Sequence, residues 1–212
     1  SNHIGTEIIA RLAKSKKVTR FILASSCSIY SEHQHTEKGE EPKNRTEEEH
    51  VDIITPYGLS KRAAEEVLQK LKNNSFQPII LRKATLYGNS PKIRYDLALN
   101  AFVKDAWSKN IITVRAGGEM YRPFLDIQDA VATYIKAIEI PFENVGTGII
   151  NVVDQNLKIK NLATIVQNEI RLKKNKNITM EIKPFEVTLG QKADNKKWMR
   201  AADSRRSFQE LC

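Results

Sequence analysis

The sequence predicts an α/β fold built around a parallel sheet. Two features of the 212 residues lead to this prediction. First, short apolar segments with the character of strands alternate along the chain with longer segments whose apolar residues recur at helical spacing. Second, a strand-like segment such as 18–26 is continuously apolar until it ends in small polar residues, which is typical of a parallel strand buried on both faces. This alternation favours a layered α/β architecture.

The first half of the chain contains two helices and two strands by this criterion. Residues 4–14 have isoleucine and leucine at helical spacing, and residues 18–26 form the first strand. Residues 31–56 are polar and acidic, so we expect a long surface loop, a kind of segment that usually serves function. A second helix is predicted over 59–71, and a second strand follows over 78–88.

The second half continues the alternation with shorter elements. We expect helices over 95–107, 126–139 and 159–172 and strands over 111–114, 148–153 and 178–182. The remaining residues, 183–212, are polar and weakly patterned, and no element is predicted there.

Composition argues against several function classes. The net charge is +9, but the 34 lysines and arginines are scattered, and the densest cluster, 171–176, directly follows a helical segment. We interpret that cluster as a solvated helix end and expect no nucleic-acid partner. No apolar run approaches the roughly 20 residues of a membrane span. Glu7 and Arg11 interrupt the first segment, so it does not have the pattern of a signal peptide.

Cysteine and histidine usage predicts neither disulfides nor a metal site. The two cysteines, Cys27 and Cys212, lie far apart and show no metal-ligand spacing, which favours a reduced, cytoplasmic compartment. His33, His35 and His50 fall in the acidic loop without the rigid spacing that a metal site needs.

Two motifs carry the predicted chemistry. SSCSIY occupies residues 25–30 at the end of the first strand, and PYGLSK occupies residues 56–61 at the start of the second helix. Tyr57 and Lys61 are four residues apart and therefore share one helix face. Tyrosine, with an ordinary pKa of about 10, is a poor base at neutral pH, but an ammonium one turn away favours the phenolate. A serine hydroxyl opposite can bond an oxygen that changes from alcohol to ketone, so the pattern indicates hydride removal from a carbinol carbon.

A collinear set of motifs resembles the extended short-chain dehydrogenase/reductase family, in its group of NAD-dependent nucleotide-sugar epimerases and dehydratases. The set comprises NHIGT at 2–6, SSCSIY, PYGLSK, LRKATLYG at 81–88 and RPFLDIQDA at 122–130. The resemblance extends from the first residue to about residue 155 and implies a Rossmann-like, doubly wound parallel sheet with a smaller, mixed substrate-binding part. The family's glycine-rich turn is absent from these residues, so the resemblance implies that the first βαβ units lie outside this chain.

The resemblance also implies a division of the chain and roles for individual residues. Residues 1–90 and 123–155 would form the remainder of the cofactor domain, and 91–122 and 156–212 the nucleotide-sugar part. The catalytic residues would be Ser26, Tyr57 and Lys61. The residues binding NAD or NADP would be Asn2, Ala24, Ser25, Tyr57, Lys61 and Ala84. The residues binding substrate would be Ser26, Thr85, Asn100 and Arg122.

Some of these assignments have alternatives. Arg122 could instead pair with Asp126 or Asp129, and Asn100 could be a plain helix-surface residue. A second phosphate-binding arginine has no clear match, and Lys192 or Arg200 could replace it.

The expected activity follows from positions 27 and 28. Sugar-nucleotide dehydratases of the family carry Asp-Glu there, whereas this chain has Cys27 and Ser28, so we expect C4 epimerisation or 4-keto reduction rather than dehydration. The expected partner is a nucleotide sugar, and the full-length protein would be a homodimer. The alternative is a catalytically silent or truncated relative that serves as a binding or assembly module.

Overall fold

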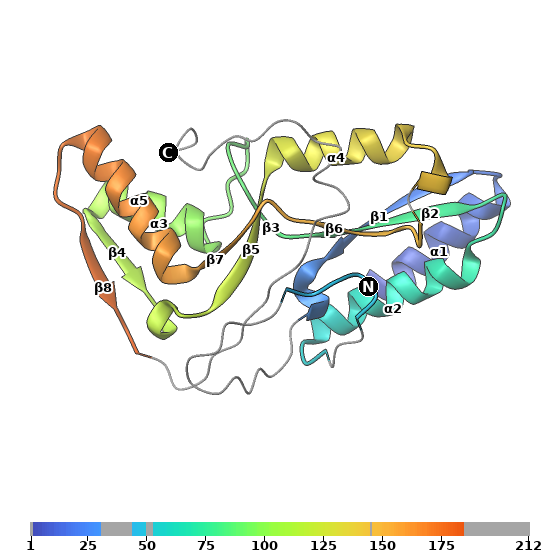
Figure 1. The fold of residues 1–212 in the computed structure, drawn as a ribbon, viewed down its shortest axis with the longest axis horizontal. Helices are drawn as coiled ribbons and strands as arrows, with labels where there is room; N and C mark the ends of the chain where they lie inside the picture. The colour runs from blue at the N-terminus through green and yellow to red at the C-terminus, as the bar shows by residue number, and fades with distance from the viewer. Residues whose placement is uncertain (1, 31–43, 50–52, 145, 185–212) are drawn as a thin grey trace.

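A three-stranded parallel sheet forms the right-hand half of the fold in the view of Figure 1. The computed structural model describes residues 2–30, 44–49, 53–144 and 146–184. The strands are β1 (Arg20–Ser26), β2 (Gln77–Lys83) and β6 (Ile149–Val152), in the order β1-β2-β6 with both pairs parallel. The predicted parallel α/β sheet is therefore confirmed.

Helices cover both faces of this sheet, as in a doubly wound fold. Helices α1 (Asn2–Ser15) and α2 (Pro56–Leu71) lie on one face, and α4 (Ile127–Glu139) lies on the other (Figure 1). Side chains of β2 alternate between these layers because successive strand residues point to opposite faces. Ile80 belongs to the core cluster that includes α1 and α2, whereas the residues on either side of it in β2 belong to the cluster that includes α4.

The predicted strand over 78–88 is two strands in different sheets, so that prediction was wrong in part. β2 ends at Lys83, and β3 (Thr85–Tyr87) pairs in parallel with β5 (Tyr121–Asp126), which pairs antiparallel with β7 (Gln155–Lys158). The reason is that both neighbours of β2 end at the level of Lys83, so the chain beyond has no partner in the first sheet.

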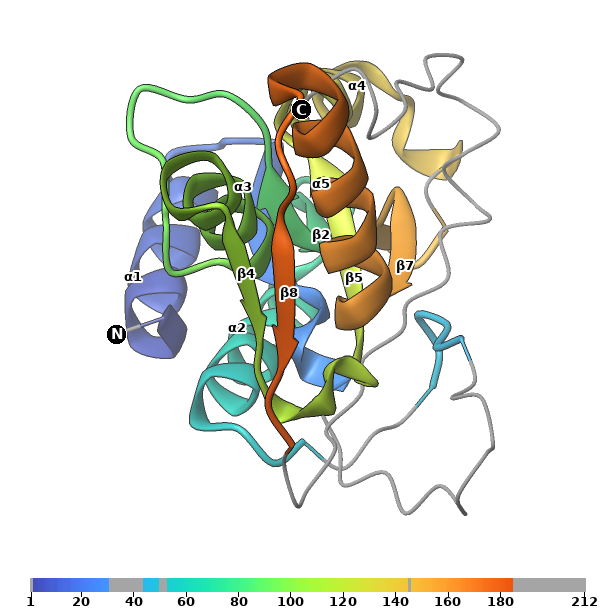
Figure 2. The same ribbon diagram turned by 90° about the vertical axis from the view of Figure 1, so that its left-hand side faces the viewer.

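A second group of elements packs beside this mixed sheet (Figure 2). Helices α3 (Ala98–Lys109) and α5 (Ile159–Lys174) pack on the two-stranded parallel sheet of β4 (Ile111–Val114) and β8 (Thr179–Ile182). The helix predicted from residue 95 begins only at Ala98, because Leu97 is the extended N-cap residue.

Three short 3-10 turns complete the described elements: η1 (Cys27–Tyr30), η2 (Ala116–Gly118) and η3 (Phe142–Asn144). Of the predicted loop over 31–56, the described residues 44–49 and 53–55 contain neither helix nor extended strand, whereas Pro56 already belongs to α2. No helix within the described part of the chain combines the length and apolarity that crossing a membrane requires.

Candidate active site

The strands of the parallel sheet end together, and Ser26 lies at this edge. Ser26 is in register with Lys83, which is in register with Val152. In open α/β sheets, ligands bind beyond the carboxyl ends of the strands. The turn η1 follows Ser26 directly, so the SSCSIY motif forms the rim of this edge.

The sequence fixes where α2 begins, and therefore where Tyr57 lies. Thr55 is the N-cap residue, and its Oγ1 accepts a hydrogen bond from the backbone N–H of Gly58 at 3.0 Å. Pro56 occupies the first helical position, where its fixed φ suits the helix and its missing N–H costs nothing. Tyr57 and Lys61 consequently lie in the first two turns.

Gly58 allows this helix start to approach the rim closely. A Cβ at this position would lie 2.8 Å from the carbonyl oxygen of Ser28 and 2.7 Å from Cγ2 of Ile53. Such separations are well inside van der Waals contact, so the observed approach requires glycine. The glycine in PYGLSK thus brings α2 against η1.

Lys61 connects the helix to the strand end. Its Nζ donates a hydrogen bond to the carbonyl oxygen of Ala24 at 2.9 Å and lies 5.7 Å from the centre of the Tyr57 ring. Partial burial lowers the pKa of Lys61, as does the charge of Lys83, whereas Glu65 raises it. Tyr57 itself is 49% exposed, so its hydroxyl-bearing ring is accessible to a ligand.

A second hydroxyl accompanies Ser26. The Oγ atoms of Ser26 and Ser28 lie 2.8 Å apart, and the N–H of Ser28 donates to Ser26 Oγ at 3.1 Å. Cys27 between them is buried, and its Sγ donates to the carbonyl oxygen of Arg82 at 3.1 Å. Burial raises the pKa of the Cys27 thiol, which therefore stays protonated, and at 2% exposure the side chain packs in the core out of reach of a ligand.

The residues predicted to bind the cofactor differ in accessibility. Ala24 is exposed, whereas Ala84 is buried. Ser25 is buried and donates its hydroxyl to Glu65, so any contact of Ser25 with a ligand would use its backbone. Asn2 donates from Nδ2 to Oγ of Ser60 at 3.3 Å, which ties the start of α1 to α2.

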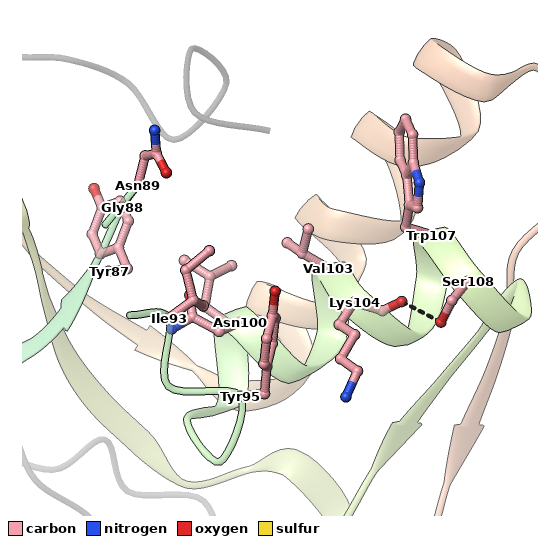
Figure 3. A pocket seen from close by; sticks show the side chains of 11 residues that line it. Tyr87, Gly88, Asn89, Ile93, Tyr95, Asn100, Val103, Lys104, Trp107 and Ser108 are labelled. Atoms are coloured by element: carbon pink, nitrogen blue, oxygen red, sulfur yellow. Dashed lines mark hydrogen bonds between the residues drawn. The ribbon is translucent and has the colours of Figure 1, made fainter. Parts of the chain in front are cut away.

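A pocket of about 460 Å³ lies on α3 and the segment that precedes it (Figure 3). Tyr95, Lys104 and Trp107 line it, with Lys104 Nζ 4.7 Å from the centre of the Tyr95 ring. Asn100 also lines this pocket, and its Nδ2 donates to the carbonyl oxygen of Arg94 at 3.0 Å. The other predicted substrate residues are not among the residues that line it.

Arg122 and Thr85 lie on the mixed sheet. Thr85 begins β3, and Arg122 is the second residue of β5. The guanidinium of Arg122 is partly buried and has no hydrogen-bond or ion-pair partner among the residues that the structure describes, so no pair with Asp126 or Asp129 forms. Burial lowers the pKa of Arg122.

Sequence reasoning assigned no role to two buried charged residues beneath the rim. Arg82 on β2 is fully buried and pairs with Glu65 on α2, with Nη2 of Arg82 2.7 Å from Oε2 of Glu65. Two signals were present: Glu65 lies one turn after Lys61 on the same face, and Arg82 interrupts an apolar strand.

Several residues considered in the sequence analysis lie outside the described residues. They are Lys192, Arg200, His33, His35, His50 and Cys212. Within the residues that are described, no group of three or more histidine, cysteine, aspartate or glutamate side chains is arranged to hold a metal ion.

The chain is similar in sequence to two proteins whose names include epimerase. A protein named "Putative UDP-arabinose 4-epimerase 4" from Arabidopsis thaliana is 28% identical over 175 residues, which is 70% of this chain and 37% of that protein. The "Uncharacterized UDP-glucose epimerase YtcB" of Bacillus subtilis is 29% identical over 119 residues, 56% of this chain and 34% of that protein. The chain thus spans about a third of the length of these curated relatives.

Solved structures show the same fold. MoeE5 in complex with UDP-glucuronic acid and NAD matches with a TM-score of 0.78 and 17% identity over 99% of this chain and 68% of that chain. UDP-glucuronic acid 4-epimerase from Bacillus cereus matches with a TM-score of 0.77 and 22% identity, covering all of this chain and 64% of that one.

A family model supplies the assignment. The model for the NAD dependent epimerase/dehydratase family matches residues 1–152, which include Ser26, Tyr57 and Lys61. The chain belongs to the NAD dependent epimerase/dehydratase family.

Proposed function

We propose that this protein is an NAD(P)-dependent nucleotide-sugar epimerase or 4-keto-sugar reductase, with Tyr57, Lys61 and Ser26 as its catalytic residues. The observation that carries the proposal is the position of Lys61. Its ammonium lies 5.7 Å from the centre of the Tyr57 ring and is bonded to Ala24, two residues before Ser26, which supports a site shared by the start of α2 and the end of β1.

The three side chains would have different roles in the transfer of the sugar hydroxyl proton. Tyr57 would accept the proton of a sugar hydroxyl, and the Lys61 ammonium would stabilise the resulting phenolate. Ser26 would hydrogen-bond the sugar oxygen as it changes from alcohol to ketone and back. NAD(P), when bound, would supply the hydride acceptor. In an epimerase, the keto sugar would then present its other face for reduction.

The residues present fit the nicotinamide-ribose end of such a cofactor. An ammonium has three donors, and the bond to Ala24 uses one, so two remain for ribose hydroxyls. Ala24 is exposed at the strand end, where a flat ring could approach its backbone. The glycine-rich turn that would bind the pyrophosphate is not part of these 212 residues.

The rim favours epimerisation or reduction over dehydration. Eliminating water from a sugar needs a separate acid and base, and the residues after Ser26 are a buried thiol and a hydroxyl. Neither side chain supplies the carboxylate that would act as acid or base in eliminating water.

The nucleotide would bind in the second half of the chain. Tyr95 and Trp107 offer aromatic faces in the pocket of Figure 3, and aromatic rings stack on nucleobases. Arg122 carries a charge without a described partner, and guanidinium binds phosphate well. We also propose that the full-length protein is a cytoplasmic homodimer; an exposed stripe on α1, formed by Ile4, Ile8, Ile9 and Leu12, supports an interface there.

The test uses the protein as its gene encodes it. UDP-, GDP-, CDP- and dTDP-sugars are assayed for C4 epimerisation and 4-keto reduction, and binding of NAD and NADP is measured separately. Tyr57→Phe should abolish turnover and leave cofactor binding nearly unchanged, because only the proton acceptor is lost. If the cofactor binds but every sugar stays untouched, the protein is the silent relative, a binding or assembly module.

A further inference from the structure

Glu65 and Arg82 form an ion pair that is completely internal. Arg82 is 0% and Glu65 2% exposed. Nε of Arg82 lies 3.2 Å from both carboxylate oxygens of Glu65, and Nη2 lies 2.7 Å from Oε2. Two nitrogens of the guanidinium therefore donate to the carboxylate. Apolar residues of similar volume often replace such a pair without loss of stability, because burying two charges is costly. Stability alone therefore does not explain it.

The Glu65 side of the pair holds the end of β1. Glu65 lies one turn beyond Lys61 on α2 and accepts a hydrogen bond from the Ser25 hydroxyl. Lys61 donates to the carbonyl oxygen of Ala24. Two successive turns of α2 are thus bonded to the two residues that precede Ser26.

The Arg82 side holds the chain that follows Ser26. Nη1 of Arg82 donates to the Tyr30 hydroxyl at 2.8 Å, and the carbonyl oxygen of Arg82 accepts from Cys27. Tyr30 in turn donates to Oδ1 of Asn151 on β6 at 2.7 Å. Residues on both sides of Ser26 are consequently bonded to one ion pair.

The same network reaches the segment 44–49. Nη1 of Arg82 also donates to the carbonyl oxygen of Glu47 at 3.1 Å, and Nδ2 of Asn151 donates to that of Arg45 at 3.2 Å. This fixes the segment beside the rim.

We infer that Glu65 and Arg82 are positioning residues, which set the separation between Ser26 on the strand end and Tyr57 and Lys61 on α2. The inference rests on the proposed catalytic role of those three residues. Neither Glu65 nor Arg82 contacts the reacting atoms; each acts through the backbone and side chains that bracket Ser26. Small displacements matter here, because misplacing a reacting group by about 1 Å can cost about 100-fold in rate.

The decisive variant combines Glu65→Leu with Arg82→Met in the full-length protein. It leaves no buried charge unpaired, so a cooperative melting transition close to that of wild type is expected. We expect kcat to fall about 100-fold while KM and cofactor affinity stay within about twofold. The control is Arg62→Met with Glu66→Leu, which removes a more exposed ion pair from the same helix and should change none of kcat, KM and cofactor affinity.

The pH dependence of the rate provides a second test, because a residue that served stability alone would not shift the pH at which the rate falls. Lys61 faces Glu65 on its own helix, Lys83 on β2 and the Tyr57 ring. Because Glu65 raises the pKa of Lys61, Glu65→Gln should lower it, and the alkaline limb of the rate profile should move to lower pH. If this single variant does not fold, the double variant decides.

Amide hydrogen exchange makes the result independent of turnover. In the double variant, peptides covering 24–30 and 44–49 should exchange at least about tenfold faster, whereas those of β4 should not change. An unchanged rate in 24–30, or a double variant with wild-type kcat, overturns the inference. If the wild-type protein converts no nucleotide sugar, the proposed function fails, and exchange still decides whether the pair orders the rim.

Discussion

Single residues of the two motifs determine the geometry at the strand edge. The sequence predicted Tyr57 and Lys61 on one helix face, and the structure adds that Lys61 is bonded to the residue two before Ser26. It could not predict Glu65 with Arg82, because these residues are 17 apart and meet only when α2 packs on β2. A buried arginine in an apolar strand signals a partner without identifying it.

Gly58→Ala should show how tightly the helix start approaches the rim. The added Cβ would lie 2.7–2.8 Å from Ile53, Thr55 and the Ser28 carbonyl, so backbone must move. We expect a loss of about 1–3 kcal/mol in unfolding free energy and a fall in kcat, measured by urea unfolding and initial rates.

Gly5→Ala is the matched control. Gly5 also lies in a helix, but a Cβ there meets nothing within 4 Å. Alanine is the better helix former, so stability should rise by up to about 1 kcal/mol. Equal effects of the two substitutions would show that helix propensity, not close approach, governs position 58.

At the scale of elements, the helices and strands with strong apolar patterns were predicted well, and strands with weak patterns were missed. The strand 18–26 and the helix 59–71 are long periodic or continuous apolar runs, and both exist close to their predicted bounds. β7, with the sequence QNLK, has no apolar pattern and exists because it pairs with β5. β5 contains Pro123, and proline argues against a central strand, yet β5 lies between two partners.

The start of α2 depends on a single cap. Thr55→Ala removes the acceptor of the Gly58 N–H and should cost about 1 kcal/mol of unfolding free energy, measured by urea unfolding. Thr55→Ser keeps the oxygen and should stay close to wild type. A serine variant as unstable as the alanine variant would mean that the methyl group of Thr55, rather than its hydrogen bond, supports the helix.

At the scale of the molecule, the candidate catalytic residues and the aromatic pocket belong to different sheets. Ser26 ends a strand of the parallel sheet, whereas the pocket lies on α3, which packs with β4 and α5. The chain passes from one part to the other where β2 ends and β3 begins. A bound nucleotide sugar would have its sugar at the parallel sheet and its base on α3, with its diphosphate between them.

Arg122 tests this arrangement, because function and stability should respond in opposite directions. A partly buried guanidinium without a described partner is a cost to folding, and burial already lowers its pKa. Arg122→Met keeps much of the length and removes the charge, so the free energy of unfolding should stay equal or rise. Binding of nucleoside diphosphates should weaken about 10- to 150-fold, since a charge-assisted hydrogen bond contributes roughly 1.5–3 kcal/mol.

Calorimetry with UDP, GDP, CDP and dTDP measures this loss without requiring turnover. Arg171→Met is the control, because Arg171 is an exposed residue in the last turn of α5 and lies far along the chain from β5. Arg122→Lys keeps the charge but loses the planar fork, so it should bind between wild type and Arg122→Met. If Arg122→Met binds every diphosphate as wild type does and unfolds more easily, Arg122 is a structural residue and the diphosphate lies elsewhere.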